Sequence, residues 1–282
     1  MLARFVHSYW PARNGNVTMA VITISRGSFS GGRMLGERLA AKLGYRCVDR
    51  DAMVERAAAS GVSAQELLDA LLTAPNLLER LRHTRYKYLA LLQAALAEEV
   101  QSGNVVYHGN AGHLLLQGGG PVLCARVIAP REFRIAMAMG ALRRSRDEAI
   151  AYVERVDEER RQWTRYLYGV EWEDISIYDV IINLEQLGIE QACEILAGMG
   201  KRRCFEATTE CQEQMENLVL ASRVKARLAL VEATAHLEFE VAAAGGRVTI
   251  QANLSSPQEI VDARRIAEST PGVRSVDLGM AA

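Results

Sequence analysis

The chain has 282 residues, 49% of them hydrophobic and 24% charged. It therefore has enough apolar side chains for a packed core and is long enough for about two domains. The 34 acidic residues nearly balance the 33 basic ones, which argues against a bulk nucleic-acid binder but leaves room for a local phosphate site. Only four of the basic residues are lysines, at positions 42, 87, 201 and 225, so any mechanism that needs a lysine must use one of these.

The cysteines and the N-terminus indicate where the protein works. The five cysteines are scattered without a CxxC pair, a pattern that indicates neither a zinc site nor a disulfide framework. No apolar run approaches the ~20 residues that cross a bilayer, and the segment before Met19 lacks the apolar core of a signal peptide. We expect a cytoplasmic protein with reduced thiols, in which residues 1–18 are either a loose arm or the product of an upstream start.

The first predicted elements are a buried strand, a glycine-rich loop and a helix. Apolar, β-branched residues fill the strand at 21–24, and leucines at 35, 39 and 43 follow helical spacing until Gly44 ends the helix. Between them lies the stretch Ser25–Arg33, called here the glycine-rich loop. Its glycines let backbone N–H groups converge at a helix N-terminus, an arrangement that favours a phosphate.

Strands and helices alternate through the next 150 residues. The patterns predict strands at 45–48, 104–107, 121–128 and 178–183, and helices at 51–59, 64–72, 76–102, 131–144, 146–168 and 189–197. Capping boxes at Ser63 with Glu66 and Ser145 with Glu148 mark two of the helix starts. This alternation predicts an α/β fold with a parallel sheet covered by helices on both faces.

The pattern changes after the predicted sheet. We interpret the polar stretch 199–214 as a linker between a domain at 19–198 and a second at 215–282. The second region shows a helix at 214–231, strands at 236–242 and 247–252 around Gly245-Gly246, a helix at 257–269 and a strand at 273–278. We expect a small α-β-β-α-β module with antiparallel strands.

The glycine-rich loop departs from the usual phosphate loop. That loop ends in Gly-Lys-Ser or Gly-Lys-Thr, where the lysine reaches the outer phosphates and the hydroxyl holds magnesium. Here Gly31-Gly32 is followed by Arg33 and Met34. A phosphate site would then take its charge from Arg33 or Arg26, and Ser28 or Ser30 would donate to phosphate or hold the metal. A plain structural turn is the alternative.

Several separated stretches resemble the cytidylate kinase-like family, a divergent branch of the nucleoside monophosphate kinases. Members of this branch also carry arginine after a Gly-Gly pair. The matching stretches are Ile22-Thr23-Ile24-Ser25-Arg26, Ser30-Gly31-Gly32-Arg33, Val48-Asp49-Arg50, Asp157-Glu158-Glu159-Arg160-Arg161, Tyr178–Asn183 and Leu187–Ala192. The resemblance implies a P-loop fold that moves the terminal phosphate of ATP to CMP, dCMP or a related acceptor with Mg²⁺. It also implies that ATP is bound by Ser25, Arg26, Gly27, Ser28, Ser30, Gly31, Gly32 and Arg33.

Phosphoryl transfer depends mainly on positioning and charge neutralisation, so arginines should close over the phosphates. Seven arginines fall between 143 and 165, interleaved with acids, and most of them fit a solvated, ion-paired helix. Asp157, Arg160 and Arg161 match the lid of the family. With Arg33 they are the predicted catalytic residues: Asp157 would orient the arginines or the acceptor base, and the two lid arginines would face the phosphoryl group.

The acceptor site is predicted at two strand ends. Asp49 and Arg50 follow a strand beside the glycine-rich loop, a suitable place for a monophosphate, although Asp49 fits a helix N-cap equally well. The resemblance places a Gly-Arg element at a later strand end, where this chain has Gly109 and Asn110. The acceptor identity therefore stays open. His108, if protonated, would replace the missing charge; otherwise it is a buried structural histidine.

The C-terminal region resembles a BON domain over about 218–279, through the alternating strand around Gly245-Gly246 and the turn at Pro271-Gly272. The resemblance implies binding of a small ligand or protein, and hence a regulatory module in a bacterial kinase. Homodimerisation is a further possibility for this region. Two other functions remain open: a nucleotide-binding sensor without catalysis and an assembly protein.

Overall fold

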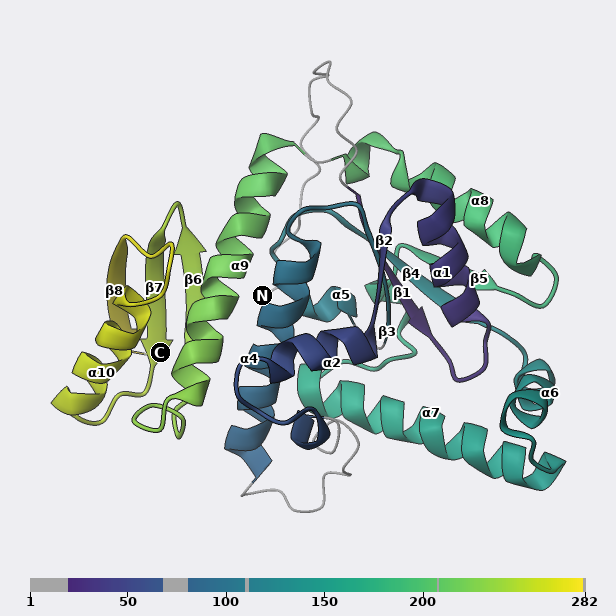
Figure 1. The fold of residues 1–282 in the computed structure, drawn as a ribbon, viewed down its shortest axis with the longest axis horizontal. Helices are drawn as coiled ribbons and strands as arrows, with labels where there is room; N and C mark the ends of the chain where they lie inside the picture. Colours follow the sequence, from purple (N-terminus) through teal and green to yellow (C-terminus); the bar gives the residue numbers. More distant parts are fainter. Residues whose placement is uncertain (1–19, 68–80, 110–111, 207, 281–282) are drawn as a thin grey trace.

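The computed structural model describes residues 20–67, 81–109, 112–206 and 208–280. Its centre is a parallel five-stranded sheet with the order β2-β3-β1-β4-β5 (Figure 1). The predicted arm at 1–18, the end of the helix expected at 64–72, and Asn110 lie outside the described residues. The strands are β1 (Val21–Arg26), β2 (Arg46–Asp49), β3 (Val105–Gly109), β4 (Val122–Ile128) and β5 (Val180–Asn183).

Helices cover both faces of this sheet, which confirms the predicted α/β architecture. Alternate strand residues point to opposite faces: Ile22 and Ile24 pack under α1 (Gly32–Leu43) and α8 (Gly188–Gly200). Val21 and Tyr107 belong to the core on the other face. That second face carries α2 (Arg50–Ala58), α4 (Leu81–Val100) and the short α5 (Gly112–Leu115).

The strand register decides which side chains meet at the carboxyl edge of the sheet. In β1, Ser25 is aligned with Gly109 of β3 and with Arg126 of β4. On the other side of β3, Asp49 of the edge strand β2 is aligned with His108. The glycine-rich loop, the end of β2 and the end of β3 therefore open onto one edge, where ligands of parallel α/β sheets bind.

Two helices extend beyond this edge, α6 (Arg131–Leu142) and α7 (Arg146–Tyr168). The predicted capping box of α7 is complete, with Ser145 and Glu148 each bonding the backbone of the other. Ser63 and Glu66 make the same reciprocal bonds. The short η1 (Ile175–Ile177) then leads from α7 back to β5.

The C-terminal module has the predicted element order but a different sheet. It consists of α9 (Thr209–Leu230), β6 (Glu240–Ala244), β7 (Arg247–Ala252), α10 (Pro257–Glu268) and β8 (Ser275–Met280), and η2 (Arg203–Phe205) precedes it. β6 and β7 are antiparallel, but β7 and β8 are parallel, so the expectation of wholly antiparallel strands was wrong. The reason is the connection: α10 carries the chain back along the sheet, so β8 starts at the same end as β7.

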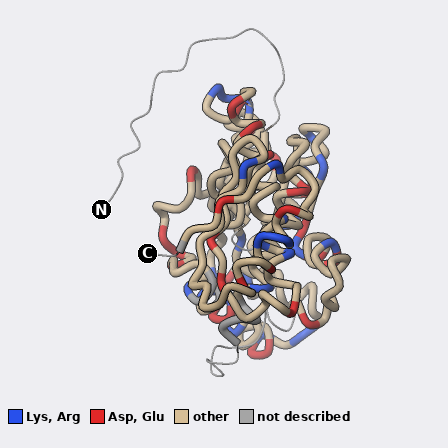
Figure 2. Tube along the Cα trace, turned by 90° about the vertical axis from the view of Figure 1, so that its left-hand side faces the viewer, with Lys and Arg blue, Asp and Glu red and all other residues tan. Residues whose placement is uncertain are grey.

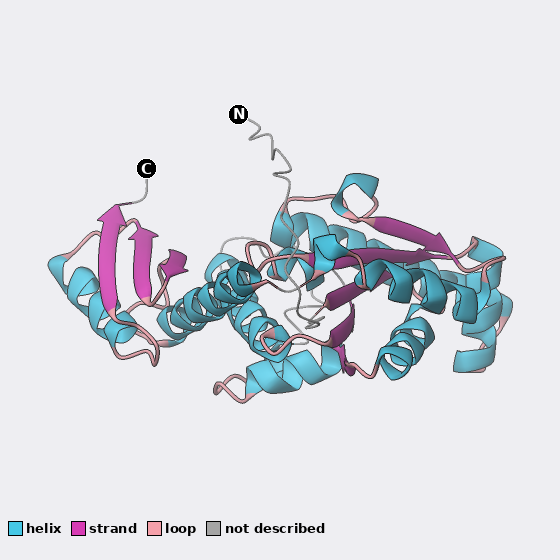
Figure 3. Cartoon of the chain, turned by 90° about the horizontal axis from the view of Figure 1, so that it is seen from above, coloured by secondary structure: helices cyan, strands magenta, loops and turns pink. Residues whose placement is uncertain are grey.

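Helix α9 belongs to two hydrophobic cores. Met215 and Val219 pack into the core that lies against α4, whereas Val224 and Leu228 pack under the small sheet. Figure 3 accordingly shows α9 between the two sheets. In addition, the Tyr86 hydroxyl of α4 donates to the carbonyl of Phe239 and accepts from its N–H, each at 2.9 Å. The module is thus joined to the main domain by packing as well as by the chain.

The surface shows mixed charge. Basic and acidic positions are interspersed along the trace in Figure 2 rather than divided between two faces, in keeping with the near-neutral composition. Within the described part of the chain, no helix combines the length and apolar character that crossing a membrane requires.

Candidate functional site

The glycine-rich loop is held by its own hydrogen bonds. Gly31 caps α1 in the left-handed region (φ 85°), and Phe29 also has a positive φ of 55°. The N–H and the hydroxyl of Ser30 both donate to the carbonyl of Gly27, at 3.4 and 3.0 Å. This fixes the turn between β1 and α1 and uses the Ser30 hydroxyl inside the loop.

Helix α7 docks on this loop from above. The Asp157 carboxylate accepts hydrogen bonds from the Ser28 hydroxyl at 2.7 Å and from the Ser28 N–H at 3.3 Å. One turn further along, the Arg160 guanidinium donates to the carbonyl of Arg26 at 3.1 Å. Two of the three predicted lid residues therefore touch the loop, although more than a hundred residues separate them from it.

A third side chain at the loop, Arg134 of α6, was not predicted from the sequence. Its guanidinium donates to the Ser28 carbonyl at 2.7 Å and to the Ser28 hydroxyl at 2.8 Å, and it forms an ion pair with Asp157. The Arg134 and Asp157 side chains are only 15% and 14% exposed. The one sequence signal for Arg134 is its place in the first turn of the helix that follows β4.

Two predicted site residues lie away from the loop contacts. Arg33 points along the exposed face of α1, where its guanidinium is 2.8 Å from Glu37 and its side chain is 68% exposed. Arg161 forms ion pairs with Glu158 and Glu173 and is 38% exposed. The structure thus brings Asp157, Arg160 and Arg134 into contact with Ser28 and Arg26 of the loop. The side chains of Arg33 and Arg161 are paired with acids elsewhere.

Two arginines at the loop, Arg26 and Arg160, lie among other positive charges. Burial, together with the positive charge of Arg26, lowers the pKa of Arg160 to about 10. Burial and then the charges of Arg50 and Arg33 lower the pKa of Arg26. Both guanidinium groups stay protonated at neutral pH and therefore repel each other. A polyanionic ligand would lower this electrostatic repulsion.

The predicted acceptor residues occupy the neighbouring strand ends. Asp49 caps α2, accepting from the N–H of Ala52 at 2.8 Å, and the Arg50 guanidinium is paired with the adjacent Asp51, at 3.3 Å. His108 is 2% exposed. Burial and the charge of Arg26 lower its pKa, so it is neutral at neutral pH and does not supply the charge that Asn110 lacks.

Ser25 anchors the segment that returns from α7. Its hydroxyl accepts from the Trp172 indole N–H at 3.0 Å and lies 3.3 Å from the Tyr178 hydroxyl. The buried Arg126 guanidinium stacks on the Trp172 ring at 4.5 Å and donates to its carbonyl. Trp172 is 3% exposed, so it is a packed core aromatic, and it ties the segment after α7 to Ser25 at the end of β1.

The side chains around the loop bear on whether a metal ion could bind there. Among the described residues, no three or more His, Cys, Asp or Glu side chains stand together as metal ligands. Mg²⁺ in phosphoryl-transfer sites usually takes one or two protein carboxylates and otherwise binds water and substrate phosphates. Asp157 of α7 places such a carboxylate at the loop, with the hydroxyl of Ser28 beside it, which fits a metal carried by a nucleotide.

Comparison with known proteins finds relatives of the main domain. A cytidylate kinase from Ignicoccus hospitalis is 29% identical over 188 residues, which cover 64% of this chain and 99% of that protein. An uncharacterized protein from Eubacterium ventriosum has a solved structure with a TM-score of 0.53 at 14% identity, covering 65% of this chain and 99% of its own, which shows a shared fold. A shikimate kinase from Bacteroides thetaiotaomicron reaches a TM-score of 0.40 at 16% identity, covering 64% of this chain and 97% of its own, too low a score for any argument.

The sequence profile of one family matches residues 21–186, more than half of the chain and the whole stretch from β1 to the segment after β5. The match includes the loop, Arg134 and the lid residues Asp157 and Arg160. The chain belongs to the cytidylate kinase-like family.

Proposed function

We propose that the protein is a nucleoside monophosphate kinase that transfers the terminal phosphate of ATP to CMP, dCMP or a related acceptor. The observation that carries the proposal is the docking of α7 on the glycine-rich loop through Asp157 and Arg160. This docking gathers cationic side chains over a backbone suited to phosphate. The chemistry requires little more than positioned reactants and neutralised charge.

Each side chain then has a physical role. Arg160 would neutralise the charge that develops on the transferred phosphoryl group, because it is the lid arginine that faces the loop. Arg134 and Asp157 would hold Ser28, and through it the loop, in position. Magnesium bound to ATP would neutralise phosphate charge, with Asp157 or the Ser28 hydroxyl as the ligand from this chain.

The test is an ADP-release assay with ATP, Mg²⁺ and a panel of nucleoside monophosphates. We expect turnover with at least one pyrimidine monophosphate. Arg160→Ala should lower kcat by about 10²- to 10³-fold while ATP affinity changes far less, as for contacts made mainly in the transition state. Arg155→Ala, which removes an arginine paired with Glu159 on the same helix, is the control. Absence of turnover with every monophosphate would overturn the proposal.

A second function, nucleotide sensing without catalysis, has one observation in its favour. The position that normally carries the metal-binding hydroxyl holds Met34, which is 42% exposed, and Arg33 beside it is paired with Glu37. ATP binding measured by calorimetry without turnover in the coupled assay would favour this function over the kinase.

We further propose that the C-terminal module is a BON-like regulatory or ligand-binding unit. Its helix α9 shares a core with α4, and Tyr86 fixes Phe239 at the edge of the small sheet. A ligand on the module would therefore act on α4 through packed contacts. Measuring kinase turnover in full-length protein and in a Tyr86→Phe variant would show whether the module and the active site are coupled.

A further inference from the structure

Two adjacent glutamates near the end of α4 connect elements that lie far apart in the chain. The Glu98 carboxylate is divided between two of them: its Oε1 lies 2.9 Å from Nε and 2.8 Å from Nη2 of Arg223 on α9, and its Oε2 lies 3.6 Å from Nη2 of Arg56 on α2. The Glu99 carboxylate also forms an ion pair with Arg56 and, at 2.8 Å, one with Arg46 of β2. These five side chains, called here the α4 bridge, form a continuous chain of ion pairs from β2 through α2 to α9.

The α4 bridge differs from a set of exposed surface pairs. The Glu99 side chain is 16% exposed and the Glu98 side chain 28%, so both carboxylates are partly withdrawn from water, where ion pairs contribute more than fully exposed ones. Arg56 is shared by the two carboxylates, so a change at one of them alters the charge around the other. The bridge therefore makes the position of Arg56, and of α2, depend on Arg223 of α9.

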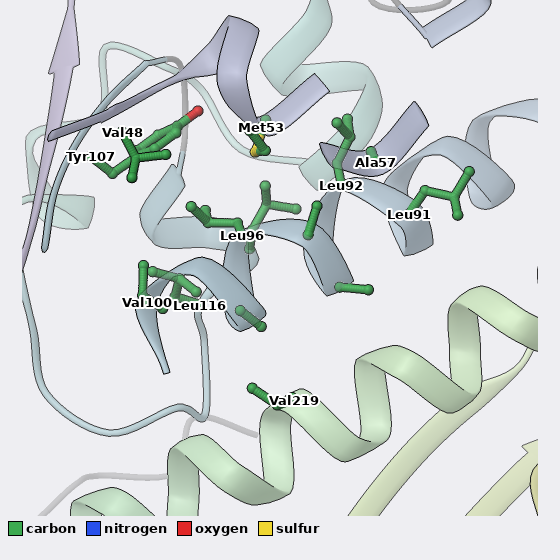
Figure 4. Packing of buried hydrophobic residues seen from close by; sticks show 14 of the residues in the cluster. Val48, Met53, Ala57, Leu91, Leu92, Leu96, Val100, Tyr107, Leu116 and Val219 are labelled. Carbon is green, nitrogen blue, oxygen red and sulfur yellow. The ribbon is translucent and has the colours of Figure 1, made fainter. Parts of the chain in front are cut away.

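Apolar packing follows the same route. One hydrophobic core contains Met53 and Ala57 of α2, Leu96 of α4 and Val219 of α9, and Figure 4 shows the α4 side chains between those of α2 and α9. Packed interiors contain few voids and transmit strain. A shift of α9 against α4 therefore reaches α2 through the core as well as through the α4 bridge.

The other end of α2 lies at the predicted acceptor site. Asp49 caps the helix and Arg50 is its first residue, at the carboxyl end of β2 and next to the end of β3. Arg56 belongs to the last turn of the same helix, which is only 9 residues long. Since a secondary element this short moves as a rigid unit, a displacement at Arg56 also moves the end that carries Asp49 and Arg50, called here the acceptor end of α2.

We propose that Glu98 and Glu99 are positioning residues of the kinase. Through Arg56 they hold the acceptor end of α2 where the monophosphate binds, and through Arg223 they make that position depend on the C-terminal module. The proposal rests on the proposed function, because it names the route by which the module acts on the active site. It gives the module an effect on the affinity for the acceptor and leaves the ATP side, formed by the glycine-rich loop and α7, unchanged.

The test compares full-length variants with wild type in the ADP-release assay. Arg223→Met and Glu98→Gln each remove one charge of the α4 bridge, and Arg38→Met is the matched control, since Arg38 of α1 is paired with Glu190 of α8 on the other face of the sheet. The KM for the monophosphate should rise about three- to tenfold in both bridge variants, while the KM for ATP stays within about twofold. Arg38→Met should change neither. Arg223→Lys, which keeps the charge but loses the planar fork, should recover part of the loss.

Amide hydrogen exchange, followed by mass spectrometry, gives a readout that needs no turnover. Exchange in α2 should be faster in Arg223→Met than in wild type, because α2 has lost part of its anchor, and unchanged in Arg38→Met. A merely local role of Arg223 would speed exchange in α9 alone. Unchanged exchange in α2, or an unchanged monophosphate KM in both bridge variants, would overturn the proposal. Faster exchange in α2 of a protein that turns over no monophosphate would sustain the link between α9 and α2 and refute the kinase.

Discussion

The contact between Asp157 and Arg134 is the strongest test of how α6 and α7 are held together at the loop. We consider Asp157→Asn. The asparagine keeps an oxygen that accepts from Ser28, but it turns an amide N–H₂ toward the Arg134 guanidinium, where the carboxylate now forms an ion pair. The substitution therefore leaves a positive charge that is 15% exposed without its counterion, and it places two donors against each other.

The cost follows from that burial. Removing one partner of a buried ion pair destabilises a protein by about 3–5 kcal/mol, because the remaining charge is uncompensated. Since both side chains retain 14–15% exposure, the lower end applies, about 3 kcal/mol of unfolding free energy. The matched control is Glu158→Gln on the same helix, where the pair with Arg161 is 49% and 38% exposed and is worth about 0–1 kcal/mol.

Urea unfolding is compared for wild type, Asp157→Asn, Arg134→Met, the double variant Asp157→Asn with Arg134→Met, and the control Glu158→Gln. The double variant should lose less than the sum of its single losses, since no buried charge remains in it. A loss in Asp157→Asn no larger than that in Glu158→Gln, or full additivity in the double variant, would refute the reasoning.

Three further outcomes follow from other contacts. Burial lowers the pKa of His113 to about 4, below its usual value of about 6.5. Its contribution to stability is therefore complete above pH ~6.5 and is lost as pH falls towards 4. His113→Gln should flatten the pH dependence of the unfolding free energy in urea between these pH values, and parallel curves for wild type and variant would contradict this. Gly109→Ala should destabilise the fold by about 1–3 kcal/mol, because its Cβ overlaps the Tyr107 hydroxyl, and Tyr107→Phe should rescue part of that loss in thermal unfolding. Thiol titration should label the exposed Cys47 and Cys204 first. Cys193, which is 1% exposed, and Cys124, whose pKa is raised by burial to about 12, should react later. Equal labelling rates would be inconsistent with the fold.

The sequence predicted the main elements because their signals are local. β-branched runs, helical leucine spacing and capping boxes depend on neighbouring residues alone, and the strand, loop and helix from Val21 to Leu43 were found as expected. The alternation of strands with helices then implied a parallel sheet, because parallel neighbours need crossover connections. The same rule, applied to α10, would have predicted the parallel pairing of β7 with β8.

The site was harder to predict because side-chain direction is a tertiary property. Asp157 and Arg160 lie three positions apart on one helix face, so both reach the loop, while Arg161 is turned to the acids beside it. Arg33 is the last residue of the loop, but its guanidinium is paired with Glu37 one turn along α1. Arg134 lies about 106 residues from Ser28 along the chain, and only the packing of α6 and α7 brings it there.

Arginine suits this site better than lysine because it makes more hydrogen bonds with one group and keeps its charge when buried. Arg134 contacts the Ser28 carbonyl, the Ser28 hydroxyl and the Asp157 carboxylate with one planar group, a fork that a lysine ammonium does not offer. Arg160 keeps its charge because burial lowers its pKa from 12.5 only to about 10. The same loss applied to a lysine, with an ordinary pKa of about 10.4, would leave it near 8 and partly neutral at cellular pH. The proposed phosphate site, which has no lysine in the loop or at Asp157–Arg161, would therefore keep its positive charge under burial that would discharge a lysine.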